Sequence, residues 1–307
     1  MSTSVFISAI YVTSCYDFGA LQAPDEVADR VLDGRAADGA QSDGRQLDGG
    51  RGDSQPDKNP RDASEPPLAC NVAQTGRGPL MVGSRAPRDA GLFCIDATEV
   101  TRNQYAQFLA ETPSTYSQIA ACQWNKTFVP SKHWPDGAPR TSDHPITYID
   151  WCDAYAFCQW AGKALCGDLD GGPHAFFRYA EPADASTDRW RVACTHAEDG
   201  MHEYPYGNTY DSLACNGKDQ ARGIALPAGS SPKCVGGFSG IFDMSGNVNE
   251  WENSCQPTKT DDGPAKDLCI LRGGSFTNSS DGVRCASAFV TTRDYAGDDV
   301  GFRCCSR

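Results

Sequence analysis

The sequence is poor in basic residues and in histidine, and it lacks several common catalytic motifs. Lysine and arginine number 27 against 40 acidic residues, a formal net charge of -13, and only five histidines occur in 307 residues. Because phosphate backbones are bound by clustered lysine and arginine, this balance argues against nucleic acid as a partner. No glycine-rich phosphate loop, HExxH or GxSxG motif is present, so the usual signatures of nucleotide-binding, zinc-protease and α/β-hydrolase sites are missing.

The cysteine spacing and the length of the apolar runs exclude two further classes. Among 15 cysteines there is no Cys-x-x-Cys pair, so zinc ribbons and thioredoxin-type redox motifs lack their usual signature. The apolar run Val5–Val12 is too short to span a bilayer. So many cysteines favour structural disulfides in an oxidising compartment. The fourteen from Cys70 onward allow seven bridges.

The N-terminus is predicted to carry an export signal and a lipid anchor. The apolar run ends in Val12-Thr13-Ser14-Cys15, which resembles the bacterial lipobox, where a small residue precedes a cysteine that becomes lipidated. Residues 1–15 are therefore predicted to be a lipoprotein signal segment, with Cys15 as the lipidation site. A charged n-region is missing, so an ordinary disordered N-terminus is the alternative. We expect a cell-envelope or outer-surface protein that touches the membrane only through its anchor.

Residues 16–78 are predicted to be a flexible, acidic tether. Asp, Gly, Arg, Ala and Pro dominate most of this stretch, and recurring fragments such as LDGRAADG and SDGRQLDGG make it low in complexity. Such a segment buries too little apolar surface to offset its conformational entropy. The folded domain is therefore expected over residues 79–307.

Local patterns in this domain predict two helices among short strands. Leu92–Ile95 is a strand candidate, and Thr101-Arg102-Asn103-Gln104 fits a capping box at the start of a helix. A second helix is expected over Trp151–Trp160, with Asp150 as its N-cap and Gly162 as its stop. The C-terminal strand candidates are ILRGGSF, VRCASAF and VGFRCC. Because the helices and strands do not alternate regularly, the pattern predicts a loop-rich α+β fold.

Six motifs occur in a fixed order along the folded domain. They are FCIDATEVTRNQYAQFL, HPITYIDWCDAYAFCQWAGKALC, YPYGN, GIFDMSGNVNEWE, RGGSF and VGFRC. Together they resemble the formylglycine-generating enzyme, or sulfatase-modifying factor, family. The resemblance implies that family's variant of the C-type lectin fold. The cysteine-rich, tethered form is similar to members found on bacterial cell envelopes.

The family's best-known activity, oxidation of a sulfatase cysteine to formylglycine with copper and oxygen, is not expected here. In the family two cysteines after the GGS turn hold the copper and the substrate thiol, which suits the preference of Cu(I) for soft thiolates. The matching positions in this chain lie near Ser275 and Asn278, and Asn278 stands where the first cysteine is expected. Cys285 aligns with a later family cysteine that forms a structural disulfide. We therefore predict no catalytic residue and no copper.

A second branch of the family makes sulfur–histidine bonds with non-haem iron held by histidines and a carboxylate in an additional helical domain. No such helical domain is expected from this sequence. His196, His202 and Glu203 form the one conceivable facial triad, and loop polarity is their more ordinary role.

The resemblance implies a calcium site more strongly than it implies a copper or an iron site. The family holds Ca²⁺ with an acidic or amide side chain, turn carbonyls and a glutamate, and here Asp243, Gly246, Val248 and Glu250 occupy those positions. Oxygen ligands on a glycine-containing loop suit Ca²⁺. An acidic turn without metal is the alternative. The family's second calcium site keeps only Asn216, so that ion is not expected.

The resemblance also implies two disulfides, Cys158–Cys304 and Cys194–Cys285. Two other pairs lie in short loops that can close locally, Cys215 with Cys234 and Cys255 with Cys269. The remaining cysteines cannot be paired from sequence alone: Cys70, Cys94, Cys122, Cys152, Cys166 and Cys305.

Three functions are compatible with these features. The first is a non-catalytic module that binds a protein, peptide or glycan ligand. The second is an oxidoreductase of the same family, working without the two thiols on a protein or small-molecule substrate. The third is a structural surface protein. The missing cysteine pair favours the first, and an apolar pocket beside Gly274 and Ser275 would favour the second.

Overall fold

The structure, a computed structural model, describes most of the chain from Cys70 onward. The described residues are 70, 77–86, 91–135, 141–176, 187–195, 202–258 and 262–307. The predicted signal segment with Cys15, and tether residues 16–69, lie outside them, as does His196.

The first sheet joins segments from the two ends of the folded domain. β1 (Met81–Arg85) pairs antiparallel with β2 (Leu92–Asp96), the strand expected at Leu92–Ile95. β8 (Cys304–Cys305) pairs with β2 on its other side, and β3 (Ala164–Leu165) pairs with β8. The strand order is therefore β1-β2-β8-β3.

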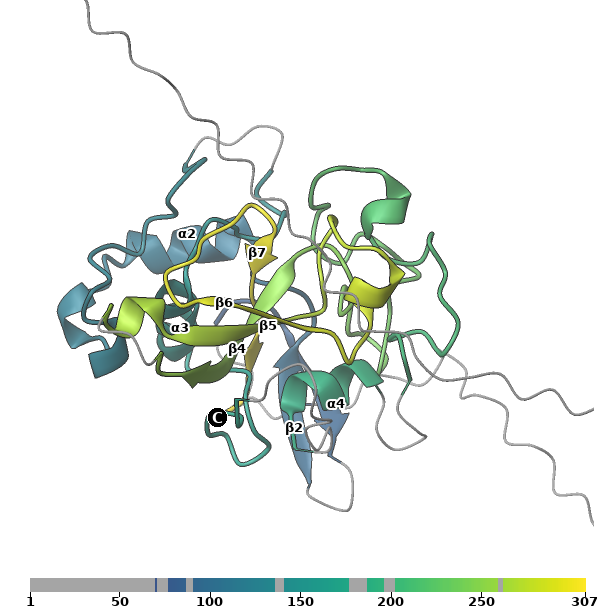
Figure 1. Cartoon of the computed structure of the whole chain (residues 1–307), viewed down its shortest axis with the longest axis horizontal. Helices are drawn as coiled ribbons and strands as arrows, with labels where there is room; N and C mark the ends of the chain where they lie inside the picture. The colour runs from purple at the N-terminus through teal and green to yellow at the C-terminus, as the bar shows by residue number, and fades with distance from the viewer. Residues whose placement is uncertain are drawn as a thin grey trace, which may run out of the picture. The chain divides into compact units, whose positions relative to one another are not determined.

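The second sheet crosses the middle of the molecule in Figure 1 and has the order β6-β5-β4-β7. Its strands are β4 (Asn249–Gln256), β5 (Leu268–Arg272), β6 (Ala288–Thr292) and β7 (Val300–Gly301). β4, β5 and β6 pair antiparallel, whereas β7 runs parallel to β4. The GNVNEWE and VGFRC motifs therefore lie side by side, although about fifty residues separate them in the sequence.

Both predicted helices form, each with the predicted cap. α2 (Arg102–Ala110) begins at Thr101, whose hydroxyl accepts from the Gln104 N–H while the Gln104 side chain accepts from the Thr101 N–H. α3 (Trp151–Trp160) begins at Asp150 with the same reciprocal arrangement.

One helix was not predicted: α4 (Arg189–Thr195) packs against β1 and β2. It is one and a half to two turns long and carries two arginines, so its sequence shows no clear apolar stripe. The 3-10 helices are η1 (Thr115–Ser117), η2 (Ala120–Cys122), η3 (Lys218–Gln220), η4 (Pro264–Lys266) and η5 (Ser280–Val283).

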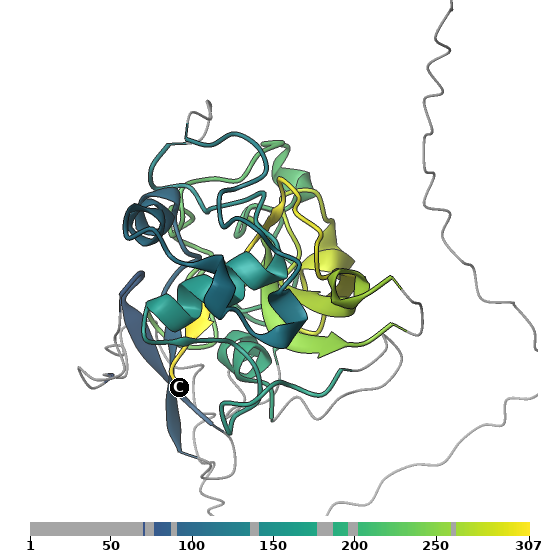
Figure 2. The same cartoon turned by 90° about the vertical axis from the view of Figure 1, so that its left-hand side faces the viewer.

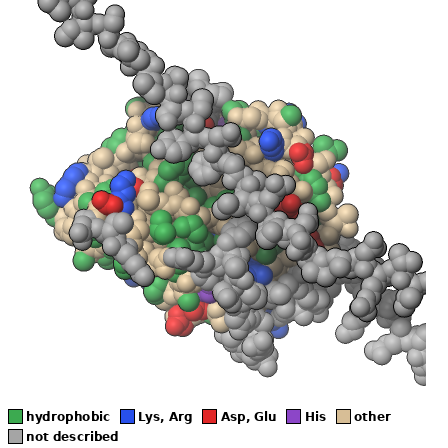
Figure 3. Space-filling view, viewed as in Figure 1, with side chains coloured by type: hydrophobic (Ala, Val, Ile, Leu, Met, Phe, Trp, Pro, Cys, Tyr) green, Lys and Arg blue, Asp and Glu red, His purple; other side chains and the backbone are tan. Residues whose placement is uncertain are grey.

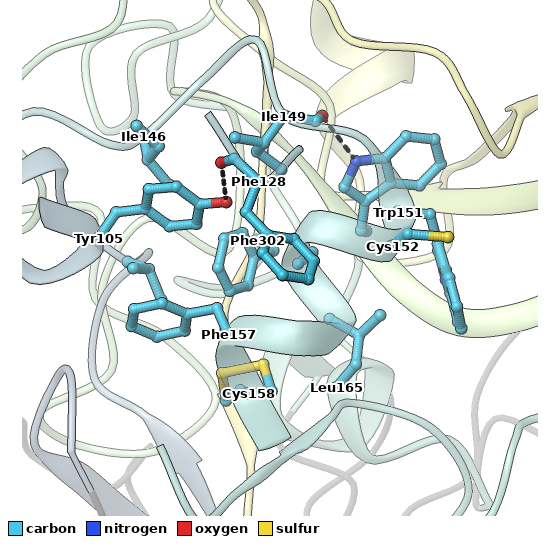
Figure 4. Close-up of a cluster of buried hydrophobic side chains, with 14 of the residues drawn as sticks. Tyr105, Phe128, Ile146, Ile149, Trp151, Cys152, Phe157, Cys158, Leu165 and Phe302 are labelled. Atoms are coloured by element: carbon cyan, nitrogen blue, oxygen red, sulfur yellow. Dashed lines mark hydrogen bonds between the residues drawn. A yellow bond between two sulfur atoms is a disulfide. The ribbon is translucent and has the colours of Figure 1, made fainter. Parts of the chain in front are cut away.

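Two buried clusters form the main hydrophobic cores. The first core, drawn in Figure 4, packs α2 and α3 against the second sheet, with Tyr105 stacked on Phe157 at 5.7 Å between ring centroids. The Tyr105 hydroxyl donates to Phe128 O at 2.8 Å, so its burial leaves no unmet hydrogen bond. The second core packs α4 against the first sheet and is built around Trp190 and Ile241.

Seven disulfides use every cysteine from Cys70 onward. The four expected pairs are present. The structure also pairs the remaining six cysteines, as Cys70–Cys94, Cys122–Cys152 and Cys166–Cys305. Bridges in this number are typical of extracellular or exported proteins.

The surface and the helices add two observations. On the face drawn in Figure 3, lysine and arginine side chains are scattered rather than gathered into a stripe. Within the described residues, no helix is both long enough and apolar enough to cross a membrane.

Candidate functional site

The turn that marks the family's active-site position follows β5 and depends on two glycines. Gly273 and Gly274 have φ values of 82° and 69°. A Cβ on Gly274 would lie 2.3 Å from Gly282 O, and one on Gly273 would lie 3.0 Å from the Trp190 ring. Only glycine fits both the backbone conformation and the space. The turn therefore holds Ser275 tightly against the segment that follows it.

Ser275 is fully buried and lies inside a cluster of polar side chains. Its N–H and its hydroxyl both lie within hydrogen-bonding distance of Asn278 Oδ1, at 2.9 and 3.0 Å. The hydroxyl is also 3.1 Å from Asp299 Oδ2 and 2.8 Å from Thr277 Oγ1. Asn249 donates its amide to Asp299 Oδ2 at 3.2 Å. Burial raises the pKa of Asp299.

This cluster does not support nucleophilic or thiol chemistry. The Asn278 amide closes the turn by accepting from Ser275, and an amide oxygen replaces neither a thiolate ligand of Cu(I) nor a thiol that exchanges disulfides. A serine hydroxyl needs a strong neighbouring base such as imidazole, and the carboxylate of Asp299 is too weak a base. Because Ser275 is fully buried, a substrate could not reach its hydroxyl in this conformation.

Cys285 is not available as a reactive thiol. It is joined to Cys194 of α4, as the resemblance implied. Its backbone N–H donates to Glu203 O at 2.8 Å, which ties the segment after η5 to the residue that precedes the YPYGN loop.

The predicted calcium residues belong to a buried acidic centre beside this turn. Asp243 and Gly246 lie on the loop before β4 with φ values of 58° and 72°. The Gly246 N–H donates to Gly273 O at 2.9 Å, so the acidic loop and the glycine turn are in direct contact. Val248 is fully buried, and its side chain packs in a small cluster with Ala225 and Phe276.

Glu250 is bound by a buried arginine. Arg303 donates from Nη2 to Glu250 Oε1 and from Nε to Oε2, both at 2.7 Å, and the two side chains are almost completely buried. Trp190 Nε1 donates to Glu250 Oε2 at 2.8 Å. Both oxygens of Glu250 are therefore engaged within the protein.

A third carboxylate, Glu99, joins this centre. Asn247 Nδ2 donates to Glu99 Oε1 at 2.8 Å, whereas the buried Glu99 Oε2 has no hydrogen-bond partner. Burial, together with the charge of Asp243, raises the pKa of Glu99 well above its usual value. Burial also raises the pKa of Asp243, to about 6.

These residues fit a calcium ion in charge and in donor type. The centre sets three carboxylates against one guanidinium, that of Arg303, and the free Glu99 Oε2 is a hard oxygen donor. In the described part of the chain, no three His, Cys, Asp or Glu side chains converge on one metal position. An ion here would therefore rely on main-chain carbonyls, as the predicted ligands Gly246 and Val248 require.

The other sequence candidates are placed as follows. Asn216 lies beside the acidic loop, where its Nδ2 donates to Asn247 Oδ1 at 3.0 Å and its buried Oδ1 has no hydrogen-bond partner. Of the conceivable iron triad, His202 and Glu203 lie next to each other on the loop before YPYGN, and His196 lies outside the described residues.

Sequence reasoning did not assign roles to Glu99, Asp299 or Arg303. Glu99 and Arg303 lie inside quoted motifs, DATEVTRN and VGFRC, but nothing in either motif shows that they meet. The parallel pairing of β4 with β7 brings Arg303 to the acidic loop. The bond from Phe242 N–H to Ala97 O, at 2.8 Å, brings the segment of Glu99 there.

Comparison with known proteins agrees with this geometry. Residues 77–307, more than half of the chain, match the family model described as "Sulfatase-modifying factor enzyme 1-like domain". An "Inactive C-alpha-formylglycine-generating enzyme 2" from Mus musculus is 26% identical over 257 residues, covering 70% of this chain and 75% of the relative. A "Formylglycine-generating enzyme" from Bos taurus is 28% identical over 284 residues, covering 76% and 69%.

Among solved structures, that titled "Crystal Structure of CarF" superimposes with a TM-score of 0.46 at 24% identity, covering 70% of this chain and 86% of that one. The fold is the expected one: α+β, loop-rich, stabilised by disulfides, and of the formylglycine-generating-enzyme variant of the C-type lectin fold. With the glycine turn, the acidic loop and the family disulfides in place, this chain belongs to the sulfatase-modifying factor family.

Proposed function

We propose that this domain is a non-catalytic ligand- or protein-binding module of a cell-envelope protein. The observation that carries the proposal is the Ser275–Asn278 contact. Where the family needs a free thiol, this chain has an amide whose oxygen accepts from the Ser275 N–H at 2.9 Å. The one cysteine of the segment, Cys285, is held in a disulfide.

The test is a formylglycine assay. Purified, oxidised full-length protein is loaded with Cu(I) and incubated in air with a sulfatase peptide containing CxPxR, and an active formylglycine-generating enzyme serves as the positive control. We expect no conversion of the cysteine, measured by mass spectrometry. Conversion above the copper-only background would show that the domain is an enzyme and would end the non-catalytic proposal.

We also propose that the acidic centre binds calcium through Asp243 and the carbonyls of Gly246 and Val248, with Glu250 and the free oxygen of Glu99 adding negative charge. A ligand that binds only the folded state at one hundred times its Kd raises the free energy of unfolding by about 2.7 kcal/mol. Calcium should therefore raise the melting temperature of the metal-free protein, and magnesium at the same concentration should raise it less.

Two variants and one control make this test specific. Asp243→Asn and Glu99→Gln keep side-chain size and remove one negative charge each, so the calcium response should shrink or disappear. Asp281→Asn removes a charge from a side chain that is 84% exposed, and its calcium response should match that of the wild type. A wild-type protein without any calcium response would show that the acidic turn holds no metal.

For the location, we propose a lipid anchor at Cys15. In a bacterial host with lipoprotein-processing enzymes, the full-length protein should fractionate with membranes, and Cys15→Ser should move it to the soluble fraction. If the wild type is already soluble, the anchor is absent.

A further inference from the structure

A cavity lies on the side of the domain that carries α2 and α3, the side facing the viewer in Figure 2. It encloses about 440 Å³, within the range of small-molecule sites. One wall is α3 and the other is the η1–η2 segment that follows α2. None of its lining residues belongs to the glycine turn or to the acidic centre.

The α3 wall is a helical face at the edge of the first core, of which Cys152 is a member and against which Tyr155 and Ala156 pack. Cys152, Tyr155, Ala156 and Gln159 line the cavity at positions i, i+3, i+4 and i+7, which fall on one side of a helix. Trp151, Ala154, Phe157 and Cys158 turn the other way, into the first core. Ala156 is the small residue in the middle of the lining face. A larger side chain at this position would fill the cavity.

The cavity walls are fixed before any ligand binds. The Cys122–Cys152 disulfide joins η2 to α3 across the cavity. Tyr155 stacks on Trp151 with 5.0 Å between ring centroids. Trp160 donates from Nε1 to Glu111 Oε2 at 2.8 Å. A preformed site loses little conformational entropy when a ligand enters it.

The lining also limits the chemistry of the ligand. None of the residues that line the cavity is Asp, Glu, Lys, Arg or His. An ionic group inside would find no opposite charge and would lose its hydration. Aromatic side chains stand on both sides, Phe108 and Phe128 near the base and Tyr155 and Trp160 on α3, and they match a planar ring.

The polar groups are too few for a sugar. They come from Ser114, Ser117, Tyr155 and two glutamines. Each glutamine already has a partner for one of its polar atoms, and the buried Gln118 Oε1 has none. Gln118 Nε2 donates to Asn125 O at 2.8 Å, and Gln159 Oε1 accepts from Arg307 at 2.7 Å. A glycan would leave most of its hydroxyls without partners.

We propose that this cavity is a binding site for an uncharged aromatic small molecule of about two rings. The inference rests on the proposed binding role and names the ligand class, at a place separate from the family's active-site position. Its failure would leave the result of the formylglycine assay unaffected.

The test uses two probes that share one scaffold and differ in charge. N-phenyl-1-naphthylamine is uncharged and becomes fluorescent in apolar sites, and 8-anilino-1-naphthalenesulfonate carries a sulfonate on the same two-part aromatic frame. Full-length protein with intact disulfides is titrated with each. We expect one saturable site for the uncharged probe and at least tenfold weaker binding of the sulfonate.

Variants locate the site. Ala156→Trp should fill the cavity and weaken binding of the uncharged probe at least tenfold, and Ala156→Leu should weaken it by a smaller factor. Ala110→Trp is the matched control, because Ala110 is an exposed residue at the end of α2 that does not line the cavity, and its affinity should equal that of the wild type. The disulfide map and melting temperature of each variant establish that it is folded.

Three results would overturn the proposal. One is no saturable binding of the uncharged probe to the wild type. Another is equal binding to the wild type and to folded Ala156→Trp and Ala156→Leu variants. The third is binding of the sulfonate as tight as that of the uncharged probe, or displacement of the probe by maltose, either of which would refute the ligand class.

Discussion

Lys163 offers a direct test of the electrostatics of the core. Its ammonium lies 2.6 Å from Asp96 Oδ1 and 2.7 Å from Pro79 O, and the Lys163 and Asp96 side chains are 1% and 0% exposed. Lys163→Met keeps most of the side-chain volume but leaves the Asp96 carboxylate without its ammonium. Breaking a buried pair from one side costs about 3–5 kcal/mol, and we expect a loss of this size at pH 7.5.

The loss of stability caused by Lys163→Met should depend on pH, and the direction of this dependence follows from the pKa of Asp96. Burial, opposed by Lys163, raises the pKa of Asp96 from 3.8 to about 6. The folded state therefore holds this proton more tightly than the unfolded state, so the contribution of Asp96 to stability falls as pH rises from about 4 to about 6, by roughly 3 kcal/mol. Without Lys163 the pKa rises further. At pH 5 the variant's Asp96 is protonated and neutral, so its deficit should shrink to about 1–2 kcal/mol, the cost of lost hydrogen bonds.

The assay is urea unfolding of the oxidised protein at pH 7.5 and pH 5, followed by tryptophan fluorescence. The double variant Asp96→Asn with Lys163→Met replaces both charges by neutral groups, and it should recover much of the stability that the single variant loses at pH 7.5. A single-variant deficit that stays the same at both pH values, or that is below about 1 kcal/mol at pH 7.5, would refute the assigned role of the pair.

Three further predictions concern the turn and its disulfide. Gly274→Ala should destabilise the domain by at least 2 kcal/mol more than Gly223→Ala in thermal unfolding, because both glycines have φ near 70° but only Gly274 has a backbone atom, Gly282 O, 2.3 Å from an added Cβ; equal losses would show that the turn has room for a side chain. Asn278→Ala should lower the free energy of unfolding by about 1–3 kcal/mol, because it leaves the Ser275 N–H unpaired. Asn278→Asp keeps an acceptor oxygen and should lower it less. A lower melting temperature for Asn278→Asp than for Asn278→Ala would contradict the role given to the Ser275–Asn278 hydrogen bond. Replacing Cys194 and Cys285 by serine should cost about 4–5 kcal/mol, more than the roughly 3 kcal/mol for the same change at Cys255 and Cys269, because the bridges span 91 and 14 residues; urea unfolding gives both values, and a larger loss for the short loop would contradict the loop-entropy account.

Features set by neighbouring residues were predictable from sequence. The Thr101–Gln104 capping box and the Asp150 cap depend on side chains three residues apart, and both form as expected. Family motifs added Cys158–Cys304 and Cys194–Cys285, pairs too distant for any local rule.

Features that depend on distant contacts were not predictable. Glu250 was predicted to be a calcium ligand, and the sequence did not indicate that Arg303, 53 residues away, binds both of its oxygens. The pattern over Trp151–Trp160 predicted a helix, but it could not show that the η1–η2 segment would leave a cavity beside that helix. The position of Asp299 beside Ser275 likewise follows from the path of β7, which no local pattern specifies.

The adjacent cysteines of β8 constrain how the protein is made. Successive residues of a strand face opposite sides, and Cys304 belongs to the first core while Cys305 belongs to the second. Their partners, Cys158 and Cys166, precede them by 146 and 139 residues. Neither core can be covalently closed until this whole stretch has been synthesised and exposed to an oxidant. Oxidative folding of the domain should therefore be completed late, in a slow step dominated by distant contacts.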